Sequence, residues 1–168
     1  MGKTGQGRPQ KVARIVSGAQ TGVDRAALDF ARSRAIDHGG WVPRGRIAED
    51  GPIPAVYRVT ETETGKYRER TERNVLDSDG TLIIFEDRIS GGTAFTRLFA
   101  LERGKPCLMV DVGRDKPDVA EAVCSWIRRH RIAVLNVAGP RESQNPGIYA
   151  KSLALLERVF HGPKKEQV

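Results

Sequence analysis

The sequence predicts an α/β fold: a single-domain, Rossmann-like parallel sheet flanked by helices on both faces. Short apolar runs alternate with amphipathic segments of about 10 to 15 residues, which is the pattern of β-α-β units. The chain has 168 residues, enough for one domain with a substantial core. Three glycine-containing stretches, at residues 17–24, 90–96 and 138–147, each follow an apolar run and precede a helical pattern.

In the first half of the chain, residues 12–17 form an apolar, β-branched run typical of a first strand. Apolar residues at helical spacing predict the first helix: Val23, Ala27, Phe30 and Ala31. We expect this helix to end at residues 37–40 and a short second strand to follow at residues 41–42. Residues 43–66 are rich in charges, glycine and proline that oppose regular structure, and a loop of this length is usually functional or disordered.

The second half repeats the alternation more clearly. A helix is predicted over about residues 66–76, and strands are predicted over residues 81–86, 107–112 and 132–137. Since residues 82–85 are all apolar, we expect the first of these strands to lie inside the sheet. Helical spacing predicts three further helices with these inward-facing residues: Phe95, Leu98 and Phe99; Val119, Val123, Trp126 and Ile127; and Tyr149, Leu153, Leu156 and Phe160.

The composition also bounds the organisation of the chain. We expect a disordered basic lead-in at residues 1–11, a ligand-binding domain at residues 12–161 and a flexible tail at residues 162–168. The two cysteines imply no disulfide framework and suit a reducing compartment. No apolar stretch approaches the ~18 residues of a membrane span, so we expect a cytoplasmic protein with no membrane partner.

The net charge of +7 comes mostly from arginine, whose planar guanidinium suits phosphate and carboxylate groups. We therefore expect an anionic small-molecule ligand. The basic residues are scattered and aromatic residues make up only 6% of the chain, so nucleic acid is not the expected partner. No Cys/His spacing typical of a metal site is present, and we expect no metal coordinated by the protein.

The three glycine-containing stretches carry the candidate ligand-binding residues. A turn from a strand into a helix directs free backbone N–H groups and the positive end of the helix dipole at one spot, which suits an anion. Three such turns on one parallel sheet would converge on one crevice. The candidates are Gly18, Gln20, Thr21, Gly22, Asp24 and Arg25 in the first turn, Gly91, Gly92, Thr93 and Thr96 in the second, and Asn136, Gly139, Pro140, Arg141, Glu142 and Ser143 in the third.

Ordinary structural roles compete with these assignments in the first two turns. Thr21 is equally able to cap the first helix by accepting a hydrogen bond from the N–H of Asp24. The run Gly91, Gly92 and Thr93 is either a phosphate cradle or a plain tight turn with a threonine cap. We favour the cradle, because the preceding strand is expected inside the sheet, where crevices form.

The third turn leaves further alternatives open. Asn145 followed by Pro146 predicts an N-cap with proline at the first helical position. Asn136 lies within an apolar strand, so it either ties down a neighbouring loop or faces the ligand. Residues 141–143 either recognise a polar ligand or are simply solvated.

Five blocks of the sequence resemble the molybdenum-cofactor carrier family, a branch of the SLOG nucleotide-binding superfamily that also includes the lonely-guy cytokinin-activating enzymes. The blocks are residues 18–29, 44–54, 67–81, 90–96 and 136–149, and with the strands between them they cover about residues 12–160. The resemblance implies a Rossmann-like sheet that binds a nucleotide, or a pterin bearing a phosphate such as the molybdenum cofactor, with the glycine pair at the phosphate. It also implies a homo-oligomer, and it places two further groups beside the site: Arg44, Glu49, Asp50 and Gly51, and Arg70, Thr71 and Asn74.

One departure from the superfamily pattern decides the predicted function. In the lonely-guy hydrolases a catalytic glutamate follows the glycine motif within the next helical turn, whereas residues 94–99 here contain no acid. We therefore predict a carrier or binding protein for a phosphate-bearing nucleotide-like or molybdopterin-type ligand, held at the carboxyl ends of the strands. The alternative is a hydrolase of nucleotide N-glycosidic or phosphate bonds, with Asp24, Glu49 or Glu142 as the base.

Overall fold

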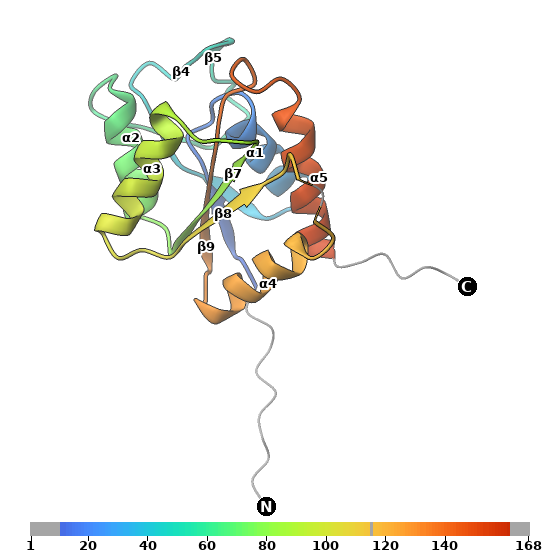
Figure 1. The fold of residues 1–168 in the computed structure, drawn as a ribbon. Coiled ribbons are helices and arrows are strands. Elements are labelled where there is room, and N and C mark those ends of the chain that lie inside the picture. Colours follow the sequence, from blue (N-terminus) through green and yellow to red (C-terminus); the bar gives the residue numbers. More distant parts are fainter. Residues whose placement is uncertain (1–10, 115, 162–168) are drawn as a thin grey trace, which may run out of the picture.

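A parallel sheet of five strands forms the centre of the computed structural model, which describes residues 11–114 and 116–161 (Figure 1). The strands are β1 (Arg14–Val16), β2 (Asp37–Gly39), β7 (Gly80–Phe85), β8 (Cys107–Asp111) and β9 (Val134–Ala138). Their order is β2-β1-β9-β7-β8, and every neighbouring pair is parallel. The predicted Rossmann-like sheet is confirmed, and β7 lies inside it between β9 and β8.

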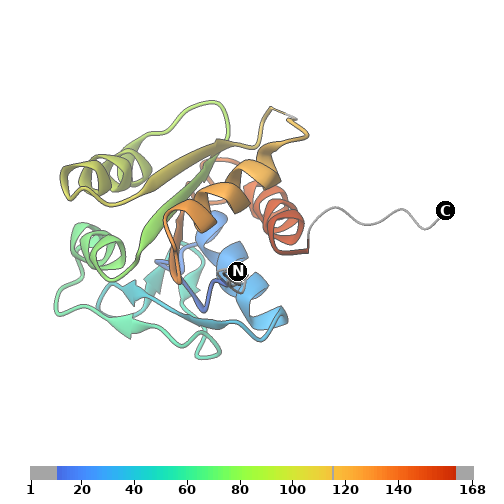
Figure 2. The ribbon, with the colours of Figure 1, turned by 90° about the horizontal axis from the view of Figure 1, so that it is seen from below.

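Helices cover both faces of the sheet (Figures 1 and 2). They are α1 (Val23–Ser33), α2 (Tyr67–Leu76), α3 (Gly91–Glu102), α4 (Val119–Arg129) and α5 (Ile148–His161). Helices α1, α4 and α5 pack on one face, and α2 and α3 pack together on the other. This division follows from the strand pleat, since alternate side chains of a strand point to opposite faces.

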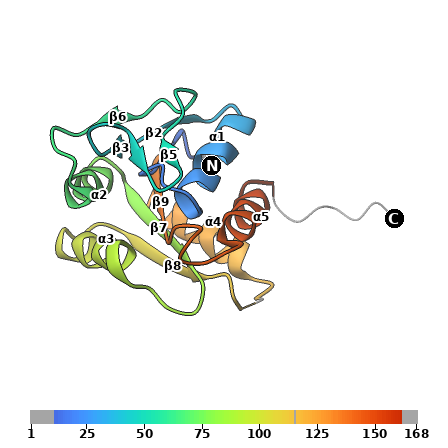
Figure 3. The same ribbon diagram turned by 90° about the horizontal axis from the view of Figure 1, so that it is seen from above.

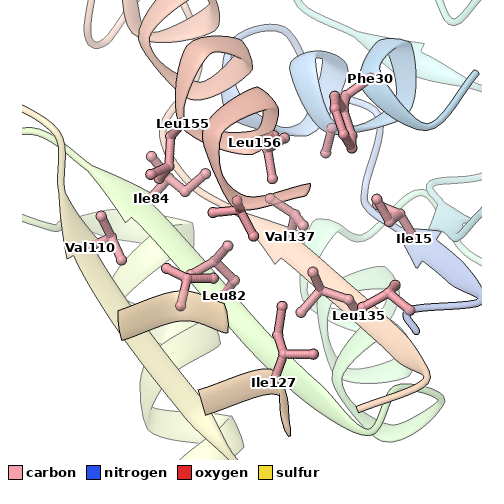
Figure 4. Packing of buried hydrophobic residues seen from close by; sticks show 14 of the residues in the cluster. Ile15, Phe30, Leu82, Ile84, Val110, Ile127, Leu135, Val137, Leu155 and Leu156 are labelled. Carbon is pink, nitrogen blue, oxygen red and sulfur yellow. The ribbon is translucent and has the colours of Figure 1, made fainter. Parts of the chain in front are cut away.

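The largest apolar cluster lies between the sheet and α1, α4 and α5 (Figure 4). Leu82 and Ile84 of β7 reach it from the sheet, and Phe30 and Leu156 reach it from α1 and α5. All four side chains are fully buried. Complete burial of an aliphatic or aromatic side chain contributes roughly 1.5–3 kcal/mol, so this cluster stabilises the packing of α1, α4 and α5 on the sheet.

The segment between β2 and α2 is more ordered than predicted. It contains β3 (Trp41–Val42), β4 (Ile47–Ala48), β5 (Gly51–Pro52) and β6 (Thr60–Glu61). Strand β3 pairs with β6, and β4 pairs with β5 as a hairpin. The expectation that residues 43–66 lack regular structure is wrong for these strands. Ala48, Ile53 and Tyr57 pack against Leu28 of α1, which gives the segment a small core of its own.

One predicted boundary and one predicted orientation are also wrong. Helix α1 ends at Ser33, and residues 37–39 form β2, because these residues pair with β1 in parallel register. The strand predicted at residues 41–42 exists, but it pairs with β6 outside the central sheet. Leu98 of α3 is 58% exposed, so it faces outward and not into the core.

The next expectations concern the two ends of the chain and the absence of a membrane span. The predicted flexible tail and the predicted lead-in, apart from Lys11, lie outside the described residues. Within residues 11–114 and 116–161, every helix is too short or too polar to cross a membrane.

Gly22, immediately before α1, occupies a turn that other residues adopt only with strain. Its φ is 77°, and a Cβ would lie 2.5 Å from the carbonyl oxygen of Pro140. We expect Gly22→Ala to lower the free energy of unfolding by about 2 kcal/mol, because backbone strain and a clash with main-chain atoms both oppose it. Urea denaturation measures this loss.

Gly65→Ala provides the matched control, because a Cβ at Gly65 meets no atom within 4 Å. We expect its free energy of unfolding to stay within about 0.5 kcal/mol of the parent protein. Equal, small effects of the two substitutions would contradict the role assigned to Gly22.

Candidate functional site

The candidate site lies at the carboxyl ends of β1, β9 and β7. The chain leaves β1 into α1 on one face of the sheet, and it leaves β7 into α3 on the other face. Figure 3 looks down on this end, with α2 and α3 on one side and α1 and α5 on the other. Such a change of direction opens a crevice at the carboxyl end of a parallel sheet, and ligands bind there in open α/β folds.

A cavity of about 410 Å³, called the cleft below, opens at this point. It is lined by Gln20 and Asp24 from the first turn, Tyr67, Arg68, Arg70 and Thr71 from α2, Gly91, Gly92, Thr93, Phe95 and Thr96 from α3, and Ala138, Gly139, Arg141 and Gln144 after β9. The cleft thus brings together residues from all three predicted turns. A second hollow of about 430 Å³ adjoins it, and Thr93 and Gln144 line both.

The N-terminus of α3 is an uncapped helix end on the cleft. Ser90 makes no side-chain capping hydrogen bond, as is also true of the N-cap residues of α1, α2 and α4. Those three helices each have an acid in the first turn, whereas α3 has none there. A Cβ built on Gly91 or Gly92 would meet no protein atom within 4 Å. The open space in front of this helix end therefore admits an anion, which the exposed N–H groups and the helix dipole attract.

The charged side chains of the cleft leave a positive excess. Three arginines and one carboxylate line it. Arg68 is paired with a glutamate of its own helix at 2.9 Å, and Arg70 is paired with Asp24 at 3.4 Å. Arg141 has no carboxylate within 4.0 Å among the described residues, and its guanidinium lies 4.9 Å from the ring centroid of Tyr67. Arg141 is therefore the cleft arginine whose charge is available to a ligand.

Asp24 and Arg70 form a buried ion pair that joins α1 to α2. Asp24 is 4% exposed, and its Oδ2 accepts hydrogen bonds from the N–H of Gln20 at 3.3 Å and from Nη1 of Arg70 at 3.4 Å. Burial raises the pKa of the Asp24 carboxyl group, and the guanidinium of Arg70 opposes that rise. A Cβ on Gly18 would lie 1.6 Å from Nη1 of Arg70, so this glycine makes room for the pair.

Glu49, between β4 and β5, ties the first predicted turn to the third. Its carboxylate accepts hydrogen bonds from the hydroxyl of Thr21 and from both the hydroxyl and the N–H of Ser143. These bonds, chiefly that from the Ser143 hydroxyl, lower the pKa of Glu49. Thr21 therefore does not cap α1, which is one of the two roles that the sequence allows it. It precedes the N-cap residue Gly22, and its hydroxyl accepts a hydrogen bond from the N–H of Glu142 at 3.2 Å.

Glu142 caps the last helix. Its carboxylate accepts hydrogen bonds from the N–H groups of Gly147 at 2.5 Å and Tyr149 at 3.0 Å. Helix α5 begins at Ile148, so the predicted N-cap at Asn145 and first helical position at Pro146 are wrong. The φ of Gly147 is 90°, which breaks the helical path between Pro146 and the start of α5.

Several predicted residues lie away from the cleft wall. Arg25 pairs with Asp50 at 3.0 Å and so holds the β4–β5 hairpin. Arg44 is exposed and donates its N–H to a backbone carbonyl 3.0 Å away. Asn136 is buried and donates from Nδ2 to Oγ1 of Thr81 at 3.2 Å. It ties β9 to β7, which is neither of the two roles proposed from the sequence.

The remaining predicted residues have packing or mixed roles. A Cβ on Gly139 would lie 2.2 Å from the carbonyl oxygen of Ile84, so Gly139 allows close approach of two strand ends. Pro140 lines the second hollow. Thr96 lines the cleft and donates its hydroxyl to the carbonyl of Gly92 at 2.8 Å.

Five cleft residues are not among the candidates named from the sequence: Tyr67, Arg68, Phe95, Ala138 and Gln144. An aromatic residue at the start of the highly charged helix α2 was the available signal for Tyr67. Helical spacing placed Phe95 in the core, and it does lie partly buried at the edge of the cleft. As for a metal centre, within the described residues no three His, Cys, Asp or Glu side chains are grouped to hold a metal ion.

Comparisons with known proteins identify the family and support the fold. The model of the circularly permutated YpsA SLOG family matches residues 15–160. A crystal structure of a protein from Syntrophus aciditrophicus SB, named "Putative molybdenum carrier protein", is 50% identical to this chain, with a TM-score of 0.87. The match covers 88% of this chain and 94% of that one. No curated protein matches. The family resemblance stated from the sequence blocks is confirmed.

Removal of Arg70 tests the buried ion pair. Arg70→Met leaves the Asp24 carboxylate buried without its cation, and we expect a loss of about 3 kcal/mol in the free energy of unfolding near neutral pH. Burial already raises the pKa of Asp24 in the parent protein, and without Arg70 the folded pKa lies higher still. The stability of the variant is therefore present at low pH and is lost as the pH rises through this folded pKa. The deficit should therefore shrink on acidification toward about pH 5.

Urea denaturation at several pH values measures this deficit. The double variant Asp24→Asn/Arg70→Met should recover part of the stability at neutral pH, because the buried charge is gone. A deficit of the same size at every pH would contradict the proposed pairing.

Proposed function

The chain belongs to the circularly permutated YpsA SLOG family, and on this premise we propose that its cleft binds a small phosphate-bearing ligand, nucleotide-like or of molybdopterin type, which the protein holds or carries. The name of the Syntrophus relative supports a carrier role and a molybdenum-related ligand. The observation that carries the proposal is the uncapped N-terminus of α3, open to the cleft beside Arg141.

The phosphate would lie in front of Gly91 and Gly92. Their N–H groups stand at the start of a helix of 12 residues, and a Cβ on either would meet no protein atom within 4 Å. An anion at a helix N-terminus gains roughly 0.3–2 kcal/mol from the dipole. A charge-assisted hydrogen bond from Arg141 would add roughly 1.5–3 kcal/mol.

The rest of the ligand would occupy the cleft between α2 and the turn after β9. A volume of about 410 Å³ lies in the range of small-molecule sites, roughly 300–1,000 Å³. Its walls combine the rings of Tyr67 and Phe95 with polar groups such as Gln20 and Gln144. This mixture suits a phosphate ester that carries a polar ring better than it suits a bare oxyanion.

The contacts of the three candidate carboxylates favour a protein that binds its ligand over one that hydrolyses it. Asp24 is paired with an arginine, Glu49 is bonded by two hydroxyl-bearing residues, and Glu142 caps α5. A general base must be within reach of the proton that it removes, and these three acids already have partners in the fold. We therefore propose a binding or carrier protein in preference to the hydrolase.

Gly92→Asp tests the position of the phosphate. A Cβ at this site meets nothing within 4 Å, so the fold should tolerate the side chain, while the new carboxylate would take the place of the phosphate. We expect the affinity for adenosine 5′-monophosphate and for inorganic phosphate to fall by at least about tenfold, equivalent to ~1.4 kcal/mol. Titration calorimetry measures both affinities.

The matched control is Gly65→Asp, which adds the same carboxylate where a Cβ also meets open space but away from the cleft. Its affinities should equal those of the parent protein. If Gly92→Asp bound both ligands as well as Gly65→Asp does, the phosphate would have to lie elsewhere.

Incubation with nucleoside 5′-monophosphates separates a carrier from a hydrolase. We expect chromatography to detect no free base and no phosphate beyond a blank without protein, since the three candidate acids are engaged. Turnover that Glu142→Gln abolishes and Gly65→Asp preserves would instead establish the hydrolase.

A further inference from the structure

We propose that Glu49 is a positioning residue for the ligand site: it holds the turn that carries Arg141, and so it sets the affinity of the cleft for an anion without touching the ligand. This role rests on the proposed function, because Arg141 is the arginine assigned there to the ligand. Glu49 lies between β4 and β5, and the part of the cleft lining that the structure describes includes none of residues 47–52. An element outside the cleft would thus control it.

Glu49 bonds the chain just after Arg141. Its carboxylate accepts hydrogen bonds from the hydroxyl of Ser143 and, at 3.3 Å, from the N–H of the same residue. Hydrogen bonds to an ionised carboxylate are stronger than those between neutral groups. Because one bond fixes the side chain of Ser143 and the other fixes its main chain, the position two residues beyond Arg141 is firmly held.

Thr21 extends this linkage to the residue next to Arg141. Its hydroxyl donates to the carboxylate of Glu49 and accepts from the N–H of Glu142 at 3.2 Å. The turn is closed by Gln144, whose Oε1 accepts from the N–H of Arg141 at 3.2 Å and whose own N–H donates to the Arg141 carbonyl at 3.1 Å. The main chain that carries the Arg141 side chain is therefore bonded on every side of the turn.

The hairpin that presents Glu49 is itself anchored to the first turn and to α1. The carbonyl oxygen of Ile47 accepts from Nε2 of Gln20 at 2.9 Å, and Asp50 pairs with Arg25 at 3.0 Å. Both anchors belong to the half of the chain before the cleft arginine. Glu49 thus fixes the turn after β9 against a part of the fold that is already held.

A fixed turn matters because Arg141 is the cleft arginine whose charge is available to a ligand. Its guanidinium lies 4.9 Å from the ring centroid of Tyr67 at the cleft wall. A ligand that must first order a mobile side chain loses part of its binding free energy to that ordering. With the turn held by Glu49, the arginine is presented in place before the ligand arrives.

Glu49→Asp tests the role without removing the charge. The pKa of Glu49 is lowered chiefly by the hydrogen bond from the Ser143 hydroxyl, and the charge of Arg141 contributes, so a neutral side chain would alter the electrostatics of the cleft as well as the turn. Aspartate keeps the charge and withdraws the carboxylate by one methylene group. We expect the affinities for inorganic phosphate and adenosine 5′-monophosphate, measured by titration calorimetry, to fall about three- to tenfold.

Glu121→Asp is the matched control. Glu121 also accepts from a serine hydroxyl, that of Ser125 at 3.3 Å, and from Arg128 at 2.8 Å. It lies on α4, which contributes nothing to the described lining of the cleft. Its affinities for both ligands should equal those of the parent protein.

Arg141→Met separates positioning from a general loosening of the fold. If Glu49 acts through Arg141, Glu49→Asp should change the affinities by less than about twofold once residue 141 is methionine, because coupled residues are not additive. A merely structural role would reduce the affinities by the same factor in both backgrounds.

Two substitutions of Thr21 give an independent comparison. Thr21→Val lacks the hydroxyl that joins Glu49 to Glu142, so we expect it to weaken binding of both ligands about as much as Glu49→Asp does. Thr21→Ser keeps the hydroxyl and should restore the affinities of the parent protein.

The outcomes distinguish this role from the proposed function. If the parent protein binds neither inorganic phosphate nor adenosine 5′-monophosphate, the proposed function fails and the role of Glu49 fails with it. If the parent protein binds them and Glu49→Asp binds them equally well, or loses the same factor with and without Arg141, the phosphate site stands and the positioning role is overturned. If Glu49→Asp does not fold, or Arg141→Met binds too weakly to measure, equal affinities of Thr21→Val and Thr21→Ser overturn the role and a loss in Thr21→Val alone supports it.

Discussion

The ion pair between Asp24 and Arg70 is the contact on which the cleft depends, because it links α1 and α2, two helices that cover opposite faces of the sheet. Asp24 belongs to α1 and Arg70 belongs to α2, and they meet above Gly18 at the end of β1. A buried pair of this kind is costly to form and more costly to break, since either partner alone is an uncompensated charge. The pair therefore favours one relative position of α1 and α2, and the polar groups of the cleft are presented in that position.

The glycines of the site fall into two groups that the sequence does not distinguish. Gly18, Gly22 and Gly139 are required by the protein itself, because another part of the chain occupies the space that a side chain would need. Gly91 and Gly92 stand before open space. In the sequence all five glycines lie near the start of a helix, and their neighbouring residues are of similar types. Only the positions of distant segments, such as α2 over the first turn, reveal which glycines leave room for a ligand.

The local sequence pattern correctly predicted the long, periodic elements. It failed where contacts with a residue far along the chain determine the local structure. The run at residues 82–85 correctly indicated an interior strand, because burial on both faces demands apolar residues throughout. Residues 37–39 form a strand through their pairing with β1, and their own composition does not suggest it. Thr21 leaves its predicted capping role for Glu49, 28 positions away in the chain. Such choices depend on tertiary contacts that spacing does not encode.

The place of β9 in the sheet has a consequence for how the protein is made. This strand is the last one in the described part of the chain, and it pairs with both β1 and β7. In a nascent chain that has not yet reached residue 134, the strand that joins β1 to β7 is missing, so one hydrogen-bonding edge of each is unpaired. The sheet is completed only after residues 134–138 have been synthesised, and until then exposed apolar strands favour aggregation.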